Sequence, residues 1–144
     1  MKSKLLFSLF ISFLLISCNK EDKKEERYTL SDSEKEKIES IVENTLRTEL
    51  FSHVSRPASE IKVENSFFKE IEGKPYLVSM YDDYRTNSLL EKDSQRMEYV
   101  YAGISCTSKI CSTSDGCVPK DDKKCTSCMG GAGDCVKTVT KVID

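Results

Sequence analysis

The first pattern along the chain is an apolar run that ends abruptly in charge. Lys2 and Lys4 precede residues 5–16, which are apolar except for two serines, and residues 19–27 are then almost all charged. A positive start followed by an apolar run of this length is typical of a secretory signal peptide. A membrane-spanning helix needs about 20 apolar residues, so the run is too short to be one. We therefore expect residues 1–17 to be a signal peptide.

The second pattern has helical spacing. Apolar residues recur every three or four positions from Ile38 to Leu50, which predicts an amphipathic helix from about Asp32 to His53. Ser31 and Glu34 match a capping box at its start, and Arg56-Pro57 is expected to stop it. The opposite face of the helix carries charged residues: Glu34, Lys35, Glu36, Lys37, Glu39 and Glu43.

Later segments alternate between apolar and polar residues, as strands do. Strands are predicted in this way at Ile61–Glu64 with its extension Ser66–Ile71, and at Tyr76–Tyr81, Met97–Ser105 and Val136–Ile143. Residues 72–75 have turn chemistry. Residues 82–95 are mostly polar and do not keep a regular alternation of apolar and polar positions, which predicts a long turn or a short helix around Leu89 and Leu90. Together these elements predict an α+β fold, in which one N-terminal amphipathic helix packs on a small antiparallel sheet.

This order of elements is loosely similar to that of the cystatin fold. An inhibitory cystatin carries a Gln-x-Val-x-Gly motif in a hairpin, and this chain does not contain that motif. The resemblance therefore implies only an arrangement of helix and sheet, and inhibition of proteases is not carried over.

Seven cysteines occur in the chain, and six of them lie between residues 106 and 135: Cys106, Cys111, Cys117, Cys125, Cys128 and Cys135. An even number of cysteines in an exported chain indicates a disulfide framework. Six cysteines permit 15 pairings, among which the sequence does not choose. The segment from residue 106 has few large apolar residues, so cross-links have to hold its shape. We expect a disulfide-rich C-terminal segment, 106–144, that ends in a strand paired with the sheet.

The seventh cysteine, Cys18, stands where the apolar run ends. Leu15-Ile16-Ser17-Cys18 resembles a bacterial lipobox, which has an aliphatic residue, a tolerant position, a small residue and a cysteine. The resemblance implies that the Cys18 thiol receives a diacylglycerol and that cleavage follows Ser17. Two or three acyl chains on one residue hold a domain firmly, because each buried CH₂ contributes about 0.8 kcal/mol. The alternative is an ordinary signal peptide or a short N-terminal anchor, with Cys18 incidental.

The residues after Cys18 indicate where in the cell the lipoprotein is expected to be located. Cys18-Asn19-Lys20-Glu21-Asp22 resembles a lipoprotein export signal of some Gram-negative bacteria, which implies an outer-membrane lipoprotein displayed on the cell surface. A periplasm-facing lipoprotein of the same membrane is the alternative. Residues 18–28 also suit a charged, flexible tether. The folded part is then expected as an α+β domain over residues 29–105, followed by the cysteine-rich residues 106–144.

Net charge narrows the choice of partners. Removal of residues 1–17 leaves 144 − 17 = 127 residues, with 22 − 2 = 20 basic and 24 acidic side chains and a net charge of −4. A nucleic-acid binder normally shows a basic stripe, so we expect no nucleic-acid partner. The expected partners are the membrane, through the lipid, and an extracellular or envelope protein.

Two kinds of thiol chemistry compete with structural disulfides. Cys125-Thr126-Ser127-Cys128 is a C-x-x-C, but a thioredoxin-type dithiol needs a helix at its first cysteine, and residues 129–133 are rich in glycine. A zinc site usually contains two C-x-x-C pairs, and this chain has one. Its four thiolates would be Cys117, Cys125, Cys128 and Cys135. Disulfides without a cofactor are the preferred interpretation, and a zinc-binding or redox lipoprotein is the alternative.

Other side chains give little indication of catalysis. The single histidine, His53, suits the end of the helix, where a cation is favourable, better than it suits a catalytic base. Four carboxylates could supply a pair for hydrolysis and are more simply solvated charge: Glu70, Glu72, Asp82 and Asp83. Three others could be considered for calcium but do not match the EF-hand spacing: Asp115, Asp121 and Asp122.

Tyr99 and Tyr101 share one face of their predicted strand, and they suit core or rim packing better than a ligand site. With no matched acid, base or nucleophile, we expect a non-catalytic binding or envelope-assembly module and not an enzyme. A secreted-type inhibitor or toxin-like scaffold is a third hypothesis.

Overall fold

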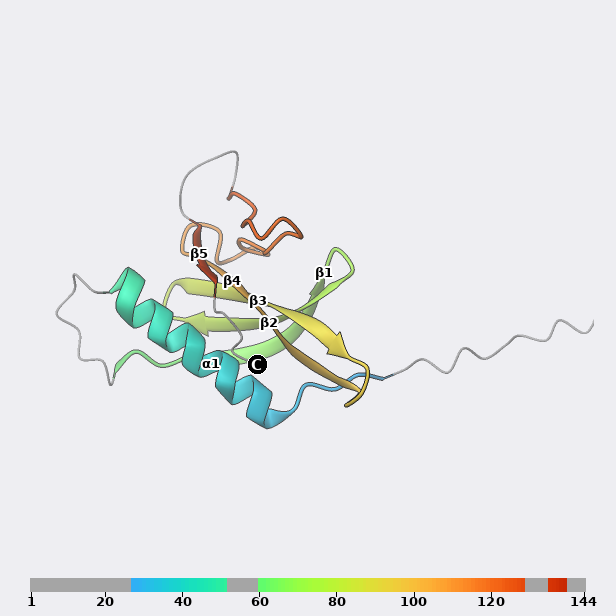
Figure 1. Cartoon of the computed structure of the whole chain (residues 1–144). Coiled ribbons are helices and arrows are strands. Elements are labelled where there is room, and N and C mark those ends of the chain that lie inside the picture. Colours follow the sequence, from blue (N-terminus) through green and yellow to red (C-terminus); the bar gives the residue numbers. More distant parts are fainter. Residues whose placement is uncertain (1–26, 52–59, 129–134, 140–144) are drawn as a thin grey trace, which may run out of the picture.

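The structure, a computed structural model, describes residues 27–51, 60–128 and 135–139. In these ranges one helix packs on a five-stranded antiparallel sheet (Figure 1), which confirms the predicted α+β arrangement. The helix, α1 (Asp32–Thr45), continues as a π-helical turn, η1 (Leu46–Leu50). The strands follow in the order β1-β2-β3-β4-β5, with the bounds β1 (Asn65–Ile71), β2 (Lys74–Tyr81), β3 (Tyr84–Asp93), β4 (Glu98–Ser108) and β5 (Val136–Val139).

Helix α1 begins as predicted, and two of its carboxylates bind backbone outside the helix. Ser31 caps the helix by accepting a hydrogen bond from the Glu34 N–H at 3.4 Å. The Glu34 carboxylate instead accepts the backbone N–H of Tyr101 in β4 at 2.9 Å. Glu43 accepts the N–H of Val63 at 2.9 Å. Glu34 and Glu43, on the charged face of the helix, therefore tie it to backbone outside the helix.

The helical part ends at Leu50, before the predicted end. Phe51 has left the helical conformation (φ −110°, ψ 8°). Its ring packs edge-on against Tyr81 and Tyr84, with ring centres 5.7 and 5.4 Å apart. His53 and Arg56-Pro57 lie outside the described residues. Within the described ranges, no helix is long and apolar enough to cross a membrane.

Two predictions for the strands are wrong. Residues 61–64 precede β1 and do not belong to it. Residues 82–95, predicted as a turn or a short helix, contain the ten-residue strand β3. Strand β4 continues past its predicted end to Ser108. The predicted last strand pairs with β4, as expected, and its described part is β5; residues 140–143 lie outside the described residues.

Tight turns join the first three strands. Glu72 and Gly73 connect β1 to β2 with positive φ angles of 52° and 76°, the conformation of a two-residue hairpin turn. Asp82 and Asp83 connect β2 to β3, and Asp82 has a φ of 52°. The turn predicted over residues 72–75 is therefore in the right place but shorter.

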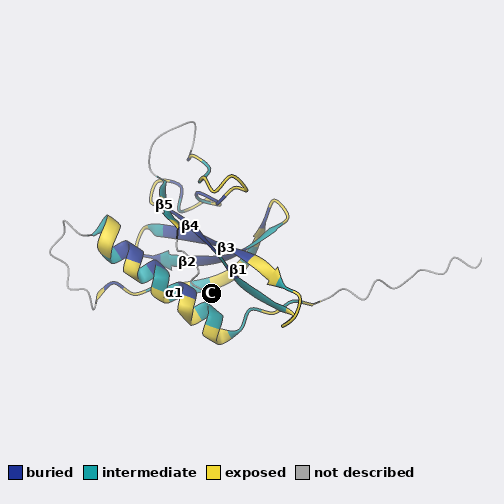
Figure 2. Cartoon of the chain, viewed as in Figure 1, coloured by how far each residue is buried: buried dark blue, intermediate teal, exposed yellow. Residues whose placement is uncertain are grey.

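The main apolar core lies between α1 and one face of the sheet (Figure 2). Successive strand residues point to opposite faces, so Leu77 and Tyr81 face the helix while Tyr76 faces away. The buried residues on the helix side form one cluster: Ile38, Val42, Leu46, Ile61, Leu77, Tyr81, Leu90 and Tyr101. Tyr99 packs against this cluster, which confirms the predicted packing role of Tyr99 and Tyr101.

The helix-facing side of the sheet also carries paired hydroxyl groups, here called the hydroxyl rows. Three pairs of oxygens join neighbouring strands: Ser66 and Ser79 at 3.1 Å, Thr86 and Thr107 at 2.8 Å, and Ser88 and Ser105 at 2.8 Å. All of these residues except Ser66 are buried. Buried polar groups normally have hydrogen-bond partners, and these pairs allow β3 to be buried although its sequence is polar.

Thr86 and Thr107 allow the hydroxyl rows to be tested. Replacing either threonine with valine leaves the hydroxyl of the other buried without this partner, which should lower the free energy of unfolding by about 1–3 kcal/mol. Replacing both removes both polar groups and keeps the shape. The double variant should therefore lose less than the sum of the single variants, a coupling that urea unfolding measures. Additive losses would contradict the pairing.

Candidate functional site

Residues 109–128, here called the cysteine segment, leave the end of β4 and pack on the face of the sheet opposite α1 (Figure 1). Val118 packs there with Ile71 of β1 and Tyr76 of β2, and all three are buried. The Tyr76 hydroxyl donates to the Pro119 carbonyl oxygen at 3.1 Å, and burial raises the pKa of this hydroxyl. The segment is therefore held on the sheet by packing as well as by its cross-links.

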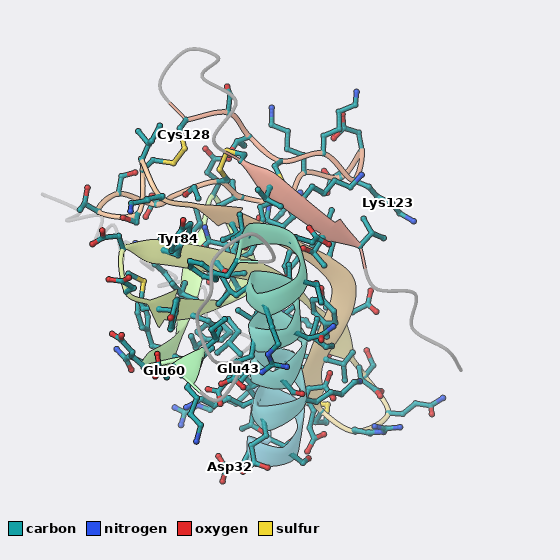
Figure 3. All side chains as sticks on the ribbon, turned by 90° about the vertical axis from the view of Figure 1, so that its left-hand side faces the viewer. Asp32, Glu43, Glu60, Tyr84, Lys123 and Cys128 are labelled. Atoms are coloured by element: carbon teal, nitrogen blue, oxygen red, sulfur yellow. A yellow bond between two sulfur atoms is a disulfide. The ribbon has the colours of Figure 1, made fainter. Side chains whose placement is uncertain are left out.

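All six cysteines predicted to form disulfides are paired: Cys106–Cys125, Cys111–Cys128 and Cys117–Cys135, with Cα atoms 5.8, 5.8 and 6.0 Å apart. Figure 3 shows sulfur–sulfur bonds beside Cys128. The Cα separations are within the range that a disulfide bridges. The pairs interleave along the chain, since each one opens before the previous one closes. This arrangement supports the predicted disulfide framework and selects one of its 15 pairings.

The two cysteines of the C-x-x-C have different partners. Cys125 is bonded to Cys106 in β4, and Cys128 is bonded to Cys111. A thioredoxin-type dithiol requires one reversible disulfide between its own two cysteines, at the start of a helix. Residues 109–128, all of them described, contain no helix. The structure therefore does not assemble the redox dithiol considered from the sequence.

Two of the disulfides lie side by side and bring four sulfur atoms together, here called the sulfur cluster. Cys117 Sγ lies 3.6 Å from Cys128 Sγ, which lies 3.7 Å from Cys135 Sγ. The sulfur atoms of Cys111, Cys117 and Cys128 all lie within 4.8 Å of one another. The alternative zinc set considered from the sequence contains Cys125 and lacks Cys111. In the structure Cys125 is bonded to Cys106, and Cys111 takes its place in the cluster.

Arg85 and Asn87 of β3 anchor the loop that leads into the sulfur cluster. Arg85 Nη1 donates to the Ser114 carbonyl oxygen at 2.6 Å, and Asn87 Nδ2 lies 2.7 Å from the carbonyl oxygens of Asp115 and Cys117. Arg85 is 6% exposed and Asn87 is fully buried. Burial lowers the pKa of Arg85. Sequence reasoning missed both anchors because it placed them in a turn, and no local pattern could have indicated their partners.

Gly116 lies against these two anchors. Its φ angle is +69°, a conformation that glycine adopts without strain. A Cβ atom at this position would lie 3.0 Å from Arg85 Cδ and 3.1 Å from Asn87 Nδ2. The loop can therefore approach the sheet this closely because residue 116 has no side chain.

Asn87 provides a direct test of the anchored loop. Replacing it with alanine removes the donor to two carbonyl groups, those of Asp115 and Cys117. We expect the free energy of unfolding, measured with urea, to fall by about 1–3 kcal/mol. Asn65→Ala is the matched control, because Asn65 is exposed at the start of β1, and should change it by less than about 0.5 kcal/mol. Equal effects would argue against an anchoring role for Asn87.

The three aspartates considered for calcium form exposed ion pairs with lysines: Lys69–Asp115, Lys74–Asp121 and Lys124–Asp122. The hydrogen bond from Lys69 holds the pKa of Asp115 below its usual value. Within the described ranges, the groups of three or more metal-ligating side chains that come together do not include these carboxylates. The structure thus gives each aspartate its own cation.

The carboxylates considered for hydrolysis lie at two separate hairpins. Glu70 and Glu72 are exposed at the β1–β2 end, and Asp82 and Asp83 are exposed at the β2–β3 end. Strand β2 separates the two turns by eight residues, or about 25 Å at the usual rise of a strand. Glycosidase carboxyl groups lie less than about 10 Å apart. A pair between the two hairpins is therefore excluded.

A second surface feature lies where the described chain begins. Tyr28, Phe68 and Tyr99, here called the aromatic cluster, are neighbours: the Tyr99 ring centre lies 5.7 Å from that of Tyr28 and 5.1 Å from that of Phe68. Lys92 Nζ lies 4.7 Å from the Tyr28 ring centre. Phe68 is 46% exposed. Aromatic residues are enriched at protein interfaces, so this cluster is a candidate contact surface.

No family model matches this chain, and neither a curated protein nor a solved structure matches it. Its function therefore has to be inferred from its own residues. Cys18, His53 and residues 129–133 were singled out in the sequence, and they lie outside the described residues.

Proposed function

We propose that this protein is a lipid-anchored outer-membrane lipoprotein that faces the cell surface and acts as a non-catalytic binding or envelope-assembly module. Cys18 would carry the lipid after removal of residues 1–17, and residues 18–28 would hold the domain off the membrane. Helix α1 would then be the N-terminal element of the processed chain. The observation that carries this function is the lipobox-like sequence Leu15–Cys18 at the end of a signal-peptide-like run.

The disulfides support export independently of the signal-peptide-like N-terminus. Disulfides persist in oxidising compartments and are rare in the cytosol, so three of them in one short segment suit an exported protein. They use six of the seven cysteines. Cys18 is the remaining one, and its thiolate is the kind of nucleophile that thioether formation with a diacylglycerol requires.

The described residues suit binding better than catalysis. A groove beside Val118 is lined partly by Lys74 and Asp121, which pair with each other, and by Tyr76, whose hydroxyl is bonded to a backbone carbonyl. Catalysis needs an acid, a base or a nucleophile that can reach a substrate, and Lys74, Asp121 and Tyr76 are already engaged. Exposed Phe68, beside half-buried Tyr28 and Tyr99 in the aromatic cluster, by contrast suits contact with a protein partner in the envelope or outside the cell.

Fatty-acid labelling of the full chain in a Gram-negative host tests the anchor. Radiolabelled palmitate should enter the wild-type protein, and Cys18→Ala should reduce its incorporation to background and leave residues 1–17 attached. The double variant Cys106→Ala/Cys125→Ala is the control, because it removes cysteines without altering the lipobox, and it should be labelled like the wild type. Palmitate incorporation into Cys18→Ala, or none into the wild type, would contradict lipid attachment at Cys18.

Protease added to intact cells tests the surface location separately, in a host that displays surface lipoproteins. The wild-type chain should be digested without permeabilisation of the outer membrane. Replacing Lys20, Glu21 and Asp22 with alanine should protect the chain from digestion and leave palmitate incorporation unchanged. A wild-type chain digested only after the outer membrane is opened would indicate that it faces the periplasm.

A further inference from the structure

We infer that the sulfur cluster binds a single zinc ion when its two disulfides are reduced. The four ligands would be Cys111, Cys117, Cys128 and Cys135. In the oxidised protein the same cysteines form two neighbouring disulfides, and the third disulfide, Cys106–Cys125, takes no part. Zinc binding at this place does not require the lipid anchor, so it stands or falls separately from the proposed function.

The spacing of the sulfur atoms is close to that of a zinc site. Zinc binds thiolate sulfur at about 2.3 Å with tetrahedral geometry, which places two ligand sulfurs about 3.8 Å apart. The two contacts between the disulfides, Cys117 to Cys128 and Cys128 to Cys135, are 3.6 and 3.7 Å. Cys111 completes a group of three sulfurs within 4.8 Å of one another. To reach tetrahedral spacing, the two bonded pairs have to move apart, and Cys135, which lies outside this group of three, has to approach Cys111.

The cluster is also shielded from water. Cys111, Cys117 and Cys128 are 7%, 0% and 3% exposed, and Cys135 is half-buried. Four protein ligands in a closed environment are typical of a structural zinc site, whereas a catalytic site keeps one position open. A zinc ion would therefore hold the cysteine segment together in place of the two disulfides, and it would not activate water.

The surroundings suit the negative charge of such a site. Four thiolates around Zn²⁺ carry a net charge of about −2. Arg85, which is always charged, is buried against Gly116, the residue before Cys117 in the chain, and its Nη2 has no hydrogen-bond partner among the described residues. Ser108 Oγ lies 3.2 Å from Cys111 Sγ, where its hydroxyl can donate to a thiolate. Both groups would stabilise the ligands from outside the coordination shell.

Electrons and protons are accounted for in two steps, reduction of the disulfides and then zinc binding. A dithiol reductant gives each disulfide two electrons and two protons and becomes a disulfide itself, so two reductant molecules convert the cluster to four thiols. One Zn²⁺ then replaces the four thiol protons, which pass to solvent. Because protons are released, the apparent zinc affinity should fall as the pH is lowered.

Native mass spectrometry of the full chain in detergent tests the site. The protein is reduced with a dithiol, freed of the reductant without oxygen and mixed with zinc chloride. The reduced chain should bind one zinc ion, and the oxidised chain should bind none. Cobalt chloride in place of zinc should give the absorption of tetrahedral thiolate coordination. Failure of the reduced wild-type chain to bind zinc would overturn the site.

Two single substitutions distinguish this ligand set, which contains Cys111, from the alternative set, which contains Cys125 in its place. Cys111→Ala should lower the zinc affinity of the reduced chain more than about tenfold, since three thiolates hold the ion less tightly than four. Cys125→Ala should leave the affinity and the cobalt spectrum unchanged. The opposite result, with zinc lost in Cys125→Ala and kept in Cys111→Ala, would contradict the ligand set. Among the described residues, the core between α1 and the sheet contains no cysteine, so far-UV circular dichroism should show that each reduced variant keeps its helix and sheet.

Discussion

Replacing Cys106 and Cys125 together with alanine should lower the free energy of unfolding by about 2–5 kcal/mol. The two cysteines are 19 residues apart in the sequence, and closing a loop of about that length removes about 3 kcal/mol of chain entropy from the unfolded state in the entropy model. Cys106 is fully buried in β4. The bond therefore also ties the cysteine segment to a strand of the sheet.

Urea unfolding of the oxidised proteins measures this loss, and the same experiment after reduction, in a metal chelator, is its control. Reduced wild type and reduced variant should unfold at nearly the same urea concentration, because the disulfide is absent from both. Ser127→Ala, an exposed change in the same segment, should alter the free energy by less than about 0.5 kcal/mol. Equal stability of the oxidised wild type and the double variant would show that this disulfide does not stabilise the fold.

Leu77→Ala should have an effect of similar size, a loss of about 2–5 kcal/mol. Leu77 is 1% exposed in β2 and belongs to the same buried cluster as Ile38 and Val42 of α1. Its truncation removes buried methyl groups and leaves a cavity between the helix and the sheet, which close only partly around it. The loss should appear as a lower midpoint in urea with little change in the slope of the transition.

Ile110→Ala is the matched control for this core substitution. Ile110 has an aliphatic side chain of the same size but is 63% exposed, so its truncation should change the free energy of unfolding by less than about 0.5 kcal/mol. A loss below about 1 kcal/mol for Leu77→Ala would contradict the packing of α1 on this face of the sheet.

The helix and the first hairpin could be predicted because their signals are local. Ile38, Val42 and Leu46 recur at helical spacing, and all three are in the core cluster. Gly73 marks the turn between β1 and β2, where a positive φ is needed. The roles of Glu34 and Glu43 could not be predicted in the same way, because each accepts a hydrogen bond from backbone far away in the sequence.

Strand β3 could not be predicted because its polar residues depend on distant partners. Thr86 and Ser88 are buried by pairing with hydroxyls of β4, and Arg85 and Asn87 are buried by carbonyl groups of residues 114–117. Each polar group is stable in the interior only when its partner is in place. The alternation of apolar and polar residues therefore gives no sign of this strand.

The same limit applies to the cysteines. Their number and export context indicate disulfides, but the pairing depends on how the cysteine segment folds onto the sheet. The loop held by Arg85 and Asn87 leads into Cys117, which lies beside Cys128. The candidate metal ligands change for this reason, with Cys111 in the cluster in place of Cys125.

The intact mass of the full chain, extracted from the membranes of cells that produce it and treated with a thiol-alkylating reagent, tests the central claim most directly. We predict that residues 1–17 are absent, that Cys18 carries a diacylglycerol, and that the other six cysteines are not alkylated because they form three disulfides. A chain that retains residues 1–17, or one that carries no lipid and takes up the alkylating reagent at several cysteines, would contradict a lipid-anchored, disulfide-stabilised module.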